Sequence, residues 1–195
     1  MRTPLLLPLL LSMTFFSGCG TAPAPTATPI STTNPCDVVD IAALQALPGF
    51  AGLGTPTMDH EQKDTYPFVN KCVVHFPDPS SKFGQQKLVQ VLIYQSREGF
   101  DAHTWYENSR KGLIELAKQT DAAYTIKIGD LTTKIGAITQ PQGVSIGGNV
   151  SDAYFDGFTL HMKTADAAVD VTAGTLFGTT LGDVAAVARV IATKL

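Results

Sequence analysis

The sequence predicts an α+β domain with a largely antiparallel sheet, and three observations support this. Strand-like segments follow one another without the regular strand–helix alternation of a parallel sheet. Segments 158–164 and 167–173 alternate apolar and polar residues and are separated by a short join, which favours an antiparallel hairpin. Apolar residues recur at helical spacing over 101–119 and 181–195. We therefore expect two helices packed on one sheet.

Composition excludes several classes of protein. The chain has 195 residues, which allows one domain with something attached. It carries 14 Lys+Arg against 17 Asp+Glu, a net charge of −3, so it lacks the basic surface that nucleic acid requires. Three cysteines are too few for a disulfide scaffold. We expect a single globular domain and no nucleic-acid partner.

The first half of this domain has clear element boundaries. A short helix is predicted over 40–47, with Asp40 as its N-cap and Pro48 at its end. The polar segment 57–66 fits either an edge strand or a loop. Segment 69–76 alternates and ends before a proline, which is typical of a strand.

The remaining segments differ in how well their patterns define them. Segment 87–96 is apolar at both alternating sets of positions, so it is predicted to be a central strand covered on both faces. Segment 124–128 alternates as a half-buried strand does. Segment 129–151 is rich in Gly, Gln and Thr and predicts no element. Thr180 and Asp183 form a capping-box pattern before the last helix.

The N-terminus resembles a lipoprotein export signal. Arg2 precedes a twelve-residue apolar run at 5–16, shorter than the roughly 20 residues of a spanning helix. A short apolar run behind a positive start is typical of a secretory signal. Phe16-Ser17-Gly18-Cys19 resembles a bacterial lipobox, which implies cleavage after residue 18 and diacylglycerol on the Cys19 thiol. The alternative is an ordinary signal peptide in which Cys19 is incidental.

A flexible tether is predicted between the lipid and the domain. Residues 20–35 carry no charge and consist mainly of Pro, Thr and Ala. Such a segment cannot bury enough apolar surface to fold. Extended at about 3.1 Å per residue, it could hold the domain up to roughly 50 Å from the membrane. We therefore expect residues 36–195 to form the domain, at the outer face of the cell membrane.

The cysteine count fits this assignment. If Cys19 is lipidated, Cys36 and Cys72 remain as a pair. Export places them in an oxidising compartment, where a disulfide forms and persists. The alternative is two buried free thiols.

Taken together, these motifs resemble a known family. They are the lipobox, the Thr/Pro tether, Asn-Pro-Cys-Asp at 34–37, Lys-Cys-Val-Val at 71–74, the Trp105 helix and Gly-Asp at 129–130. The chain resembles secreted actinobacterial lipoproteins, mycobacterial ones among them, whose domain is of unknown function. The resemblance implies an envelope protein with a small α/β domain, and it supplies no catalytic residues.

Aromatic residues suggest a binding role. Trp105 and Tyr106 of helix 101–119, with Leu92 and Tyr94 of the strand before it, are candidates to line a pocket for a small apolar ligand. The alternative is ordinary packing of these side chains in the core. We expect a non-enzymatic envelope lipoprotein that binds a small apolar ligand or a partner protein. A structural scaffold lipoprotein is the alternative.

One motif suggests catalysis. Residues 143–147 match the G-x-S-x-G pattern of serine hydrolases, with Ser145 as the nucleophile and His161 following in the chain. That motif needs a strand before it and a helix after it, and neither is predicted here, which favours a Gly-rich loop. The four histidines lack metal-ligand spacing, so neither a metal nor a cofactor is expected.

Overall fold

The computed structural model describes residues 34–63, 69–81, 84–119, 124–128, 131–135, 140–174 and 180–195. The predicted export signal, Cys19 and nearly all of the predicted tether lie outside these residues. The strands are β1 Thr57–Lys63, β2 Val69–Pro77, β3 Gln86–Gln95, β4 Tyr124–Ile128, β5 Leu131–Ile135, β6 Gln142–Gly143, β7 Asp152–Phe155, β8 Leu160–Lys163 and β9 Ala167–Gly174. The helices are η1 Pro35–Val38, α1 Ile41–Gln45, η2 Pro48–Phe50, α2 Ala102–Gln119 and α3 Leu181–Ala192.

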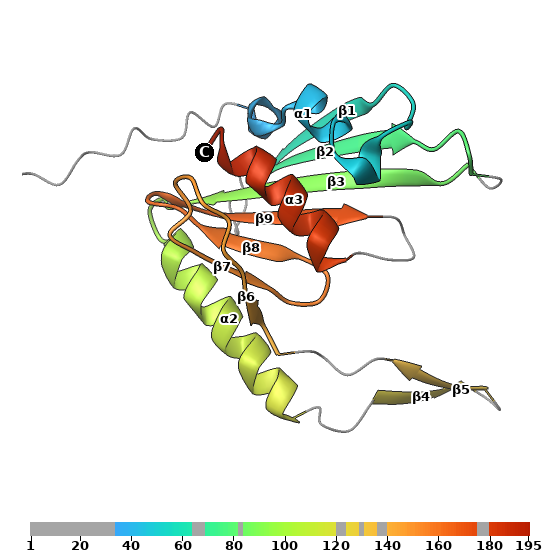
Figure 1. Ribbon diagram of the computed structural model, residues 1–195. Coiled ribbons are helices and arrows are strands. Elements are labelled where there is room, and N and C mark those ends of the chain that lie inside the picture. Colours follow the sequence, from blue (N-terminus) through green and yellow to red (C-terminus); the bar gives the residue numbers. More distant parts are fainter. Residues whose placement is uncertain are drawn as a thin grey trace, which may run out of the picture.

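Seven strands form one antiparallel sheet in the order β1-β2-β3-β9-β8-β7-β6 (Figure 1). Strands β4 and β5 pair with each other in a separate two-stranded sheet. The predicted α+β fold is confirmed, including the β8–β9 hairpin. Among the described residues, every helix is too short or too polar to cross a bilayer.

The local signals for helix ends are confirmed. The Asp40 side chain accepts a hydrogen bond from the Ala43 amide at 3.0 Å, and the Thr180 hydroxyl accepts one from the Asp183 amide at 3.2 Å. Each bond satisfies an amide that has no partner within its own helix. The polar segment 57–66 contains an edge strand, β1, whose charged side chains suit an unpaired sheet edge.

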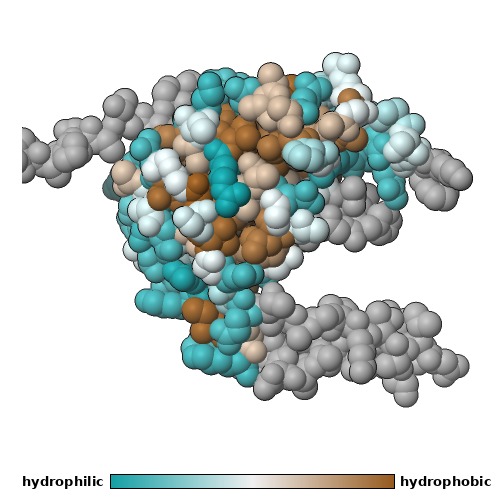
Figure 2. Space-filling model, in the orientation of Figure 1, coloured by the Kyte–Doolittle hydropathy of each residue, from teal (hydrophilic) through white to brown (hydrophobic). Residues whose placement is uncertain are grey.

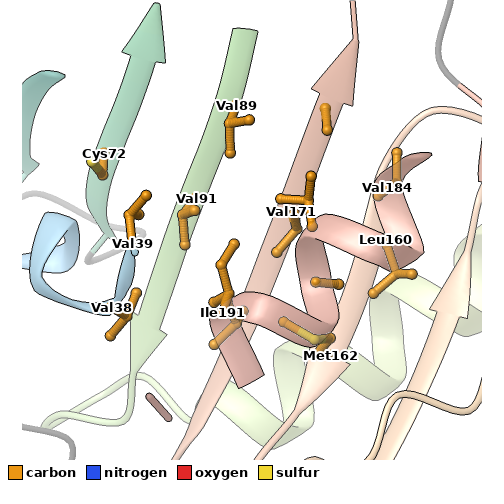
Figure 3. Close-up of a cluster of buried hydrophobic side chains, with 14 of the residues drawn as sticks. Val38, Val39, Cys72, Val89, Val91, Leu160, Met162, Val171, Val184 and Ile191 are labelled. Carbon is orange, nitrogen blue, oxygen red and sulfur yellow. The ribbon is translucent and has the colours of Figure 1, made fainter. Parts of the chain in front are cut away.

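The main core lies on the face of the sheet that carries α3, α1 and η1 (Figure 3). Every second residue of β3 points into it, namely Val89, Val91 and Ile93, and each is fully buried. The apolar stripe of α3 packs on this face through Val184, Val187, Ala188 and Ile191. Figure 2 views this side of the molecule and shows apolar residues gathered around α3.

The Cys36–Cys72 disulfide joins η1 to β2. Cys72 is completely buried, and Cys36 is nearly so. The bond therefore attaches the first turn of the domain to the sheet within the main core. Of the two sequence-based alternatives for these cysteines, the structure has the disulfide.

The opposite face of the sheet is only partly covered, which corrects the prediction for segment 87–96. Helix α2 crosses β9 and β8 rather than running along β3. Consequently Tyr94, near the end of β3, is buried under the helix, whereas Leu88 and Leu92 are only half-buried. Alternating apolar residues predicted two covered faces, but they do not specify where a helix crosses a sheet.

Segment 129–151, for which no element was predicted, contains β5 and the two-residue strand β6. The β6–β7 loop that follows packs Val144, Ile146 and Val150 against the main core. The two residues of β6 are too few for an alternating pattern, and in β5 three consecutive polar residues at 132–134 obscure it.

Candidate functional site

The predicted aromatic residues meet where α2 crosses the sheet. The rings of Tyr94 and Trp105 are stacked with centroids 4.0 Å apart, and the ring of Tyr106 lies 5.2 Å from that of Tyr154. Tyr106 is completely buried, Tyr94 is 8% exposed, and Leu92 packs at the margin of the same cluster. The structure thus buries Tyr94 and Tyr106 and places Leu92 and Trp105 half-buried at the margin of the same cluster.

A groove of about 830 Å³ lies beside Trp105. It is bordered by the 96–101 turn and the first turns of α2, through Ser96, Arg97, Gly99, Phe100, Asp101, Thr104, Trp105, Asn108 and Ser109. Of the four residues predicted to line a pocket, Trp105 alone is part of this lining. Most lining side chains carry hydrogen-bonding groups, so the groove is more polar than the apolar pocket expected from the sequence.

Asp101 shapes the end of this groove. Its carboxylate accepts a hydrogen bond from the Thr104 amide at 2.6 Å and so caps α2. Hydrogen bonds from the side chain and amide of Thr104 lower the pKa of Asp101. Ser96 supports the same corner, because its Oγ accepts from the Ala102 amide at 3.0 Å. The groove therefore contains an ionised acceptor on a fixed backbone.

His161 is the centre of a buried polar cluster on the face of the sheet that α2 partly covers. Its Nδ1 lies 2.7 Å from a carboxylate oxygen of Asp170, its neighbour across β8 and β9, and its Nε2 lies 3.2 Å from Asp156. The imidazole stacks on the Tyr154 ring at 4.5 Å. Asp156 also accepts from the amides of Phe158 and Thr159. The cluster therefore ties β8 to β9 and to the β7–β8 turn.

Two carboxylate acceptors require that both imidazole nitrogens carry a proton. Burial lowers the pKa of His161, but the hydrogen bonds to Asp156 and Asp170 and their negative charges outweigh it and raise this pKa to about 9. Burial also disfavours the charged form of Asp156 and so raises its pKa. The hydrogen bonds from His161 and two backbone amides more than offset this effect, so the pKa of Asp156 is lowered. His161 is therefore an imidazolium at neutral pH.

This cluster predicts a specific pH dependence of stability. The pKa of His161 is about 9 in the folded protein against roughly 6.5 in an unfolded chain, so its contribution is complete below pH 6.5 and is lost as the pH rises through 9. The expected loss is about 3 kcal/mol of unfolding free energy. Asp156 acts in the opposite direction. Its pKa is lowered in the folded protein, so its contribution to stability is lost as the pH falls below the usual pKa of an aspartate. Urea denaturation from about pH 2 to pH 10 covers both limbs, the Asp156 limb below its usual pKa of about 3.9 and the His161 limb up to its pKa of about 9.

The control for this pH profile is His161→Gln, which keeps a hydrogen-bonding side chain but cannot become charged. In that variant, the decline between pH 6.5 and 9 should disappear. A decline of the same size in both proteins would assign it to other groups.

Ser145 and His161 do not form the pair that a serine hydrolase requires. Ser145 lies in the loop packed on the α3 face, where its carbonyl accepts from Arg189 Nη2 at 3.3 Å. His161 points to the opposite face and has both nitrogens bound to carboxylates. Gly148 allows the loop to approach α3, since its φ is +64° and a Cβ there would lie 2.9 Å from the Ala192 carbonyl oxygen.

A smaller depression, of about 400 Å³, lies over β1, β2 and β3 on the partly covered face of the sheet. Its ionisable side chains contact one another, the Lys71 amine with the Glu61 carboxylate at 2.9 Å and His75 Nε2 with an Asp59 carboxylate oxygen at 3.2 Å. Within the described ranges, no three His, Cys, Asp or Glu side chains come together as metal ligands would. The ionisable side chains of this depression are therefore engaged with one another.

Comparison with known proteins assigns the chain to no family, so it is classified by its fold. No protein-family model matches the sequence, and no curated protein or solved structure is significantly similar to it. The class that the structure itself defines is an α+β domain with an antiparallel seven-stranded sheet. The open groove beside Trp105, which has a mixed polar and apolar lining, is its candidate binding site.

Proposed function

We propose that the protein is a lipid-anchored component of the cell envelope whose domain binds a ligand in the groove beside Trp105 without catalysing a reaction. The groove is the observation that supports ligand binding. Its volume, about 830 Å³, lies within the 300–1,000 Å³ typical of small-molecule sites. Its lining combines an aromatic ring with several hydrogen-bonding side chains, as ligand sites commonly do.

The disulfide supports the export part of the proposal. Disulfides persist in oxidising compartments and are rare in the reducing cytosol. The Cys36–Cys72 bond lies at the start of the described domain, directly after the tether that follows the Cys19 lipobox. A lipid on Cys19 would then hold a disulfide-stabilised domain at the outer face of the cell membrane.

The non-enzymatic part is supported by the state of His161. A general base must have a free nitrogen within reach of the nucleophile. Both nitrogens of His161 bind carboxylates, and Ser145 lies on the other side of the sheet. The Ser145–His161 hydrolase is therefore the weaker alternative.

Lipid anchoring is tested by expressing the full chain and a Cys19→Ala variant in an actinobacterial host. The wild-type protein should sediment with membranes, and its N-terminal peptide should carry the mass of diacylglycerol on Cys19. Cys19→Ala removes the only thiol that the lipobox presents, so the variant should lose this mass. An unmodified Cys19 in a processed wild-type chain would contradict the lipid anchor.

Ligand binding is tested by native mass spectrometry of residues 20–195 exported from the same host, compared with the denatured mass. We expect an additional mass that is lost on denaturation. Asn108→Arg places a long charged side chain in the groove and should reduce this mass. Gln45→Arg makes the same charge change at an exposed position of α1 and should leave it intact. Equal retention by both variants would place the ligand elsewhere.

A further inference from the structure

The geometry of the groove points to a neutral oligosaccharide as its ligand, and this inference rests on the proposed function. Ser96, Thr104, Asn108 and Ser109 provide hydroxyl and amide groups along the lining, and Trp105 provides an aromatic surface. Hydroxyls and a primary amide both donate and accept hydrogen bonds. Sugars present complementary groups, because the hydroxyls on the edge of a sugar ring can pair with the polar side chains and the C–H bonds on its faces can pack against the aromatic ring.

An acyl chain fits this lining poorly. Binding a hydrocarbon would exclude water from the Asp101 carboxylate and the Asn108 amide without replacing its hydrogen bonds. Leaving a desolvated polar group unpaired is unfavourable, and more so for a charged group. A hydroxylated ligand avoids this cost, because its own hydroxyls replace the lost water.

The charges of the lining favour a neutral ligand over an ionic one. Arg97 and Asp101 are the charged side chains of the lining, and their formal charges cancel. The hydrogen bonds from Thr104 keep Asp101 ionised, so the carboxylate can accept from sugar hydroxyls. A phosphate or carboxylate ligand would meet the negative charge of Asp101 as well as the positive charge of Arg97, so the lining has no net preference for an anion.

Trp105 is held in place before a ligand arrives. Its indole stacks on Tyr94 with an interplanar angle of 25°, and Tyr94 is itself buried. One face of the ring is thereby occupied, and the ring also borders the groove. The negative potential of an aromatic face attracts the partly positive C–H groups of a sugar ring. Fixing the indole in advance reduces the entropy lost on binding.

The test uses nuclear magnetic resonance and the fluorescence of Trp105, which is the sole tryptophan of the chain. Residues 20–195 are titrated with chitotetraose, cellotetraose and maltotetraose. At least one should shift the amide signals of Gly99, Thr104 and Asn108 and change the emission of Trp105, with a dissociation constant on the order of millimolar for so open a site. Asn108→Ala should weaken this binding about five-fold through the lost hydrogen bonds, whereas Gln45→Ala should leave it unchanged.

A parallel titration with dihexanoylphosphatidylcholine below its critical micelle concentration separates the two levels of the proposal. Shifts of groove signals with this lipid and with none of the three tetrasaccharides would overturn the glycan assignment and retain the groove as a binding site. If neither kind of probe shifts these signals, the glycan assignment and small-ligand binding in this groove both fail. Shifts with the sugars that Asn108→Ala leaves unaltered would place the sugar outside the groove.

Discussion

Replacing His161 with Ala is expected to lower the unfolding free energy by about 3–5 kcal/mol, the usual cost of removing one partner from a buried ion pair. His161 is 8% exposed and lies between the carboxylates of Asp156 and Asp170. Without the imidazolium, Asp170 stays buried with its principal countercharge gone. The substitution also removes the ring that stacks on Tyr154. Urea denaturation at pH 6, where the contribution of His161 is complete, measures the loss.

A second variant separates charge from packing. Replacing His161 and Asp170 together with Leu removes the buried charge pair and fills its volume with apolar atoms, an exchange that is often neutral. We therefore expect His161→Leu/Asp170→Leu to be more stable than His161→Ala. If His161→Ala costs less than 1 kcal/mol, the cluster is not a major source of stability.

Removing the disulfide is expected to have an effect of similar size. Cys36 and Cys72 are 36 residues apart in the chain, and closing a loop of that length restricts the unfolded chain by about 4 kcal/mol in the chain-entropy model. Cys36→Ser/Cys72→Ser should lose about this much unfolding free energy. The double replacement avoids leaving a single reactive thiol beside the core.

Reduction of the wild-type protein provides the matched control for this variant. Both treatments remove the same covalent link, so the reduced protein should lose a similar free energy. Any further loss in the double variant measures the cost of placing serine hydroxyls at two buried positions. An oxidised protein no more stable than the reduced one would show that strain in the folded state cancels the entropic gain. The midpoint of Gln45→Ala, which alters neither the disulfide nor the core, gives the experimental scatter.

Much of the fold could be predicted because its signals are local. The Asp40 and Thr180 caps and the alternation in the 87–96 segment depend on residues close together in the chain. The β8–β9 hairpin was visible for the same reason, since its strands are joined by a short turn. The short strand β6 was not, because two residues carry no period.

The candidate site was predicted only in part, because it depends on how α2 crosses the sheet. Trp105 and Tyr106 are consecutive on one helix, yet one borders the groove and the other is completely buried. Apolar spacing indicates which face of a helix is buried but not the angle at which the helix crosses a sheet. The polar side of the groove comes from the 96–101 turn, which has no periodic pattern.

The His161 cluster could not be predicted from the sequence either. Its partners lie five residues before and nine residues after it, and sheet register brings Asp170 opposite His161. Alternation predicts which side of a strand a residue faces, but not which residue of the neighbouring strand it meets. The sequence made the same histidine a candidate general base, whereas in the structure it is an imidazolium held between two carboxylates.

The sequence by itself determined the α+β class, the helix caps and the pairing candidates Cys36 and Cys72, because composition and short-range pattern are sufficient for these. Tertiary structure alone decided that the cysteines are joined, that His161 is bound between two carboxylates, and that a groove opens beside Trp105. Each of these depends on a distance between residues that chain order leaves undefined. The packing of η1 on β2 sets the first, the register of β8 and β9 sets the second, and the position of α2 on the sheet sets the third.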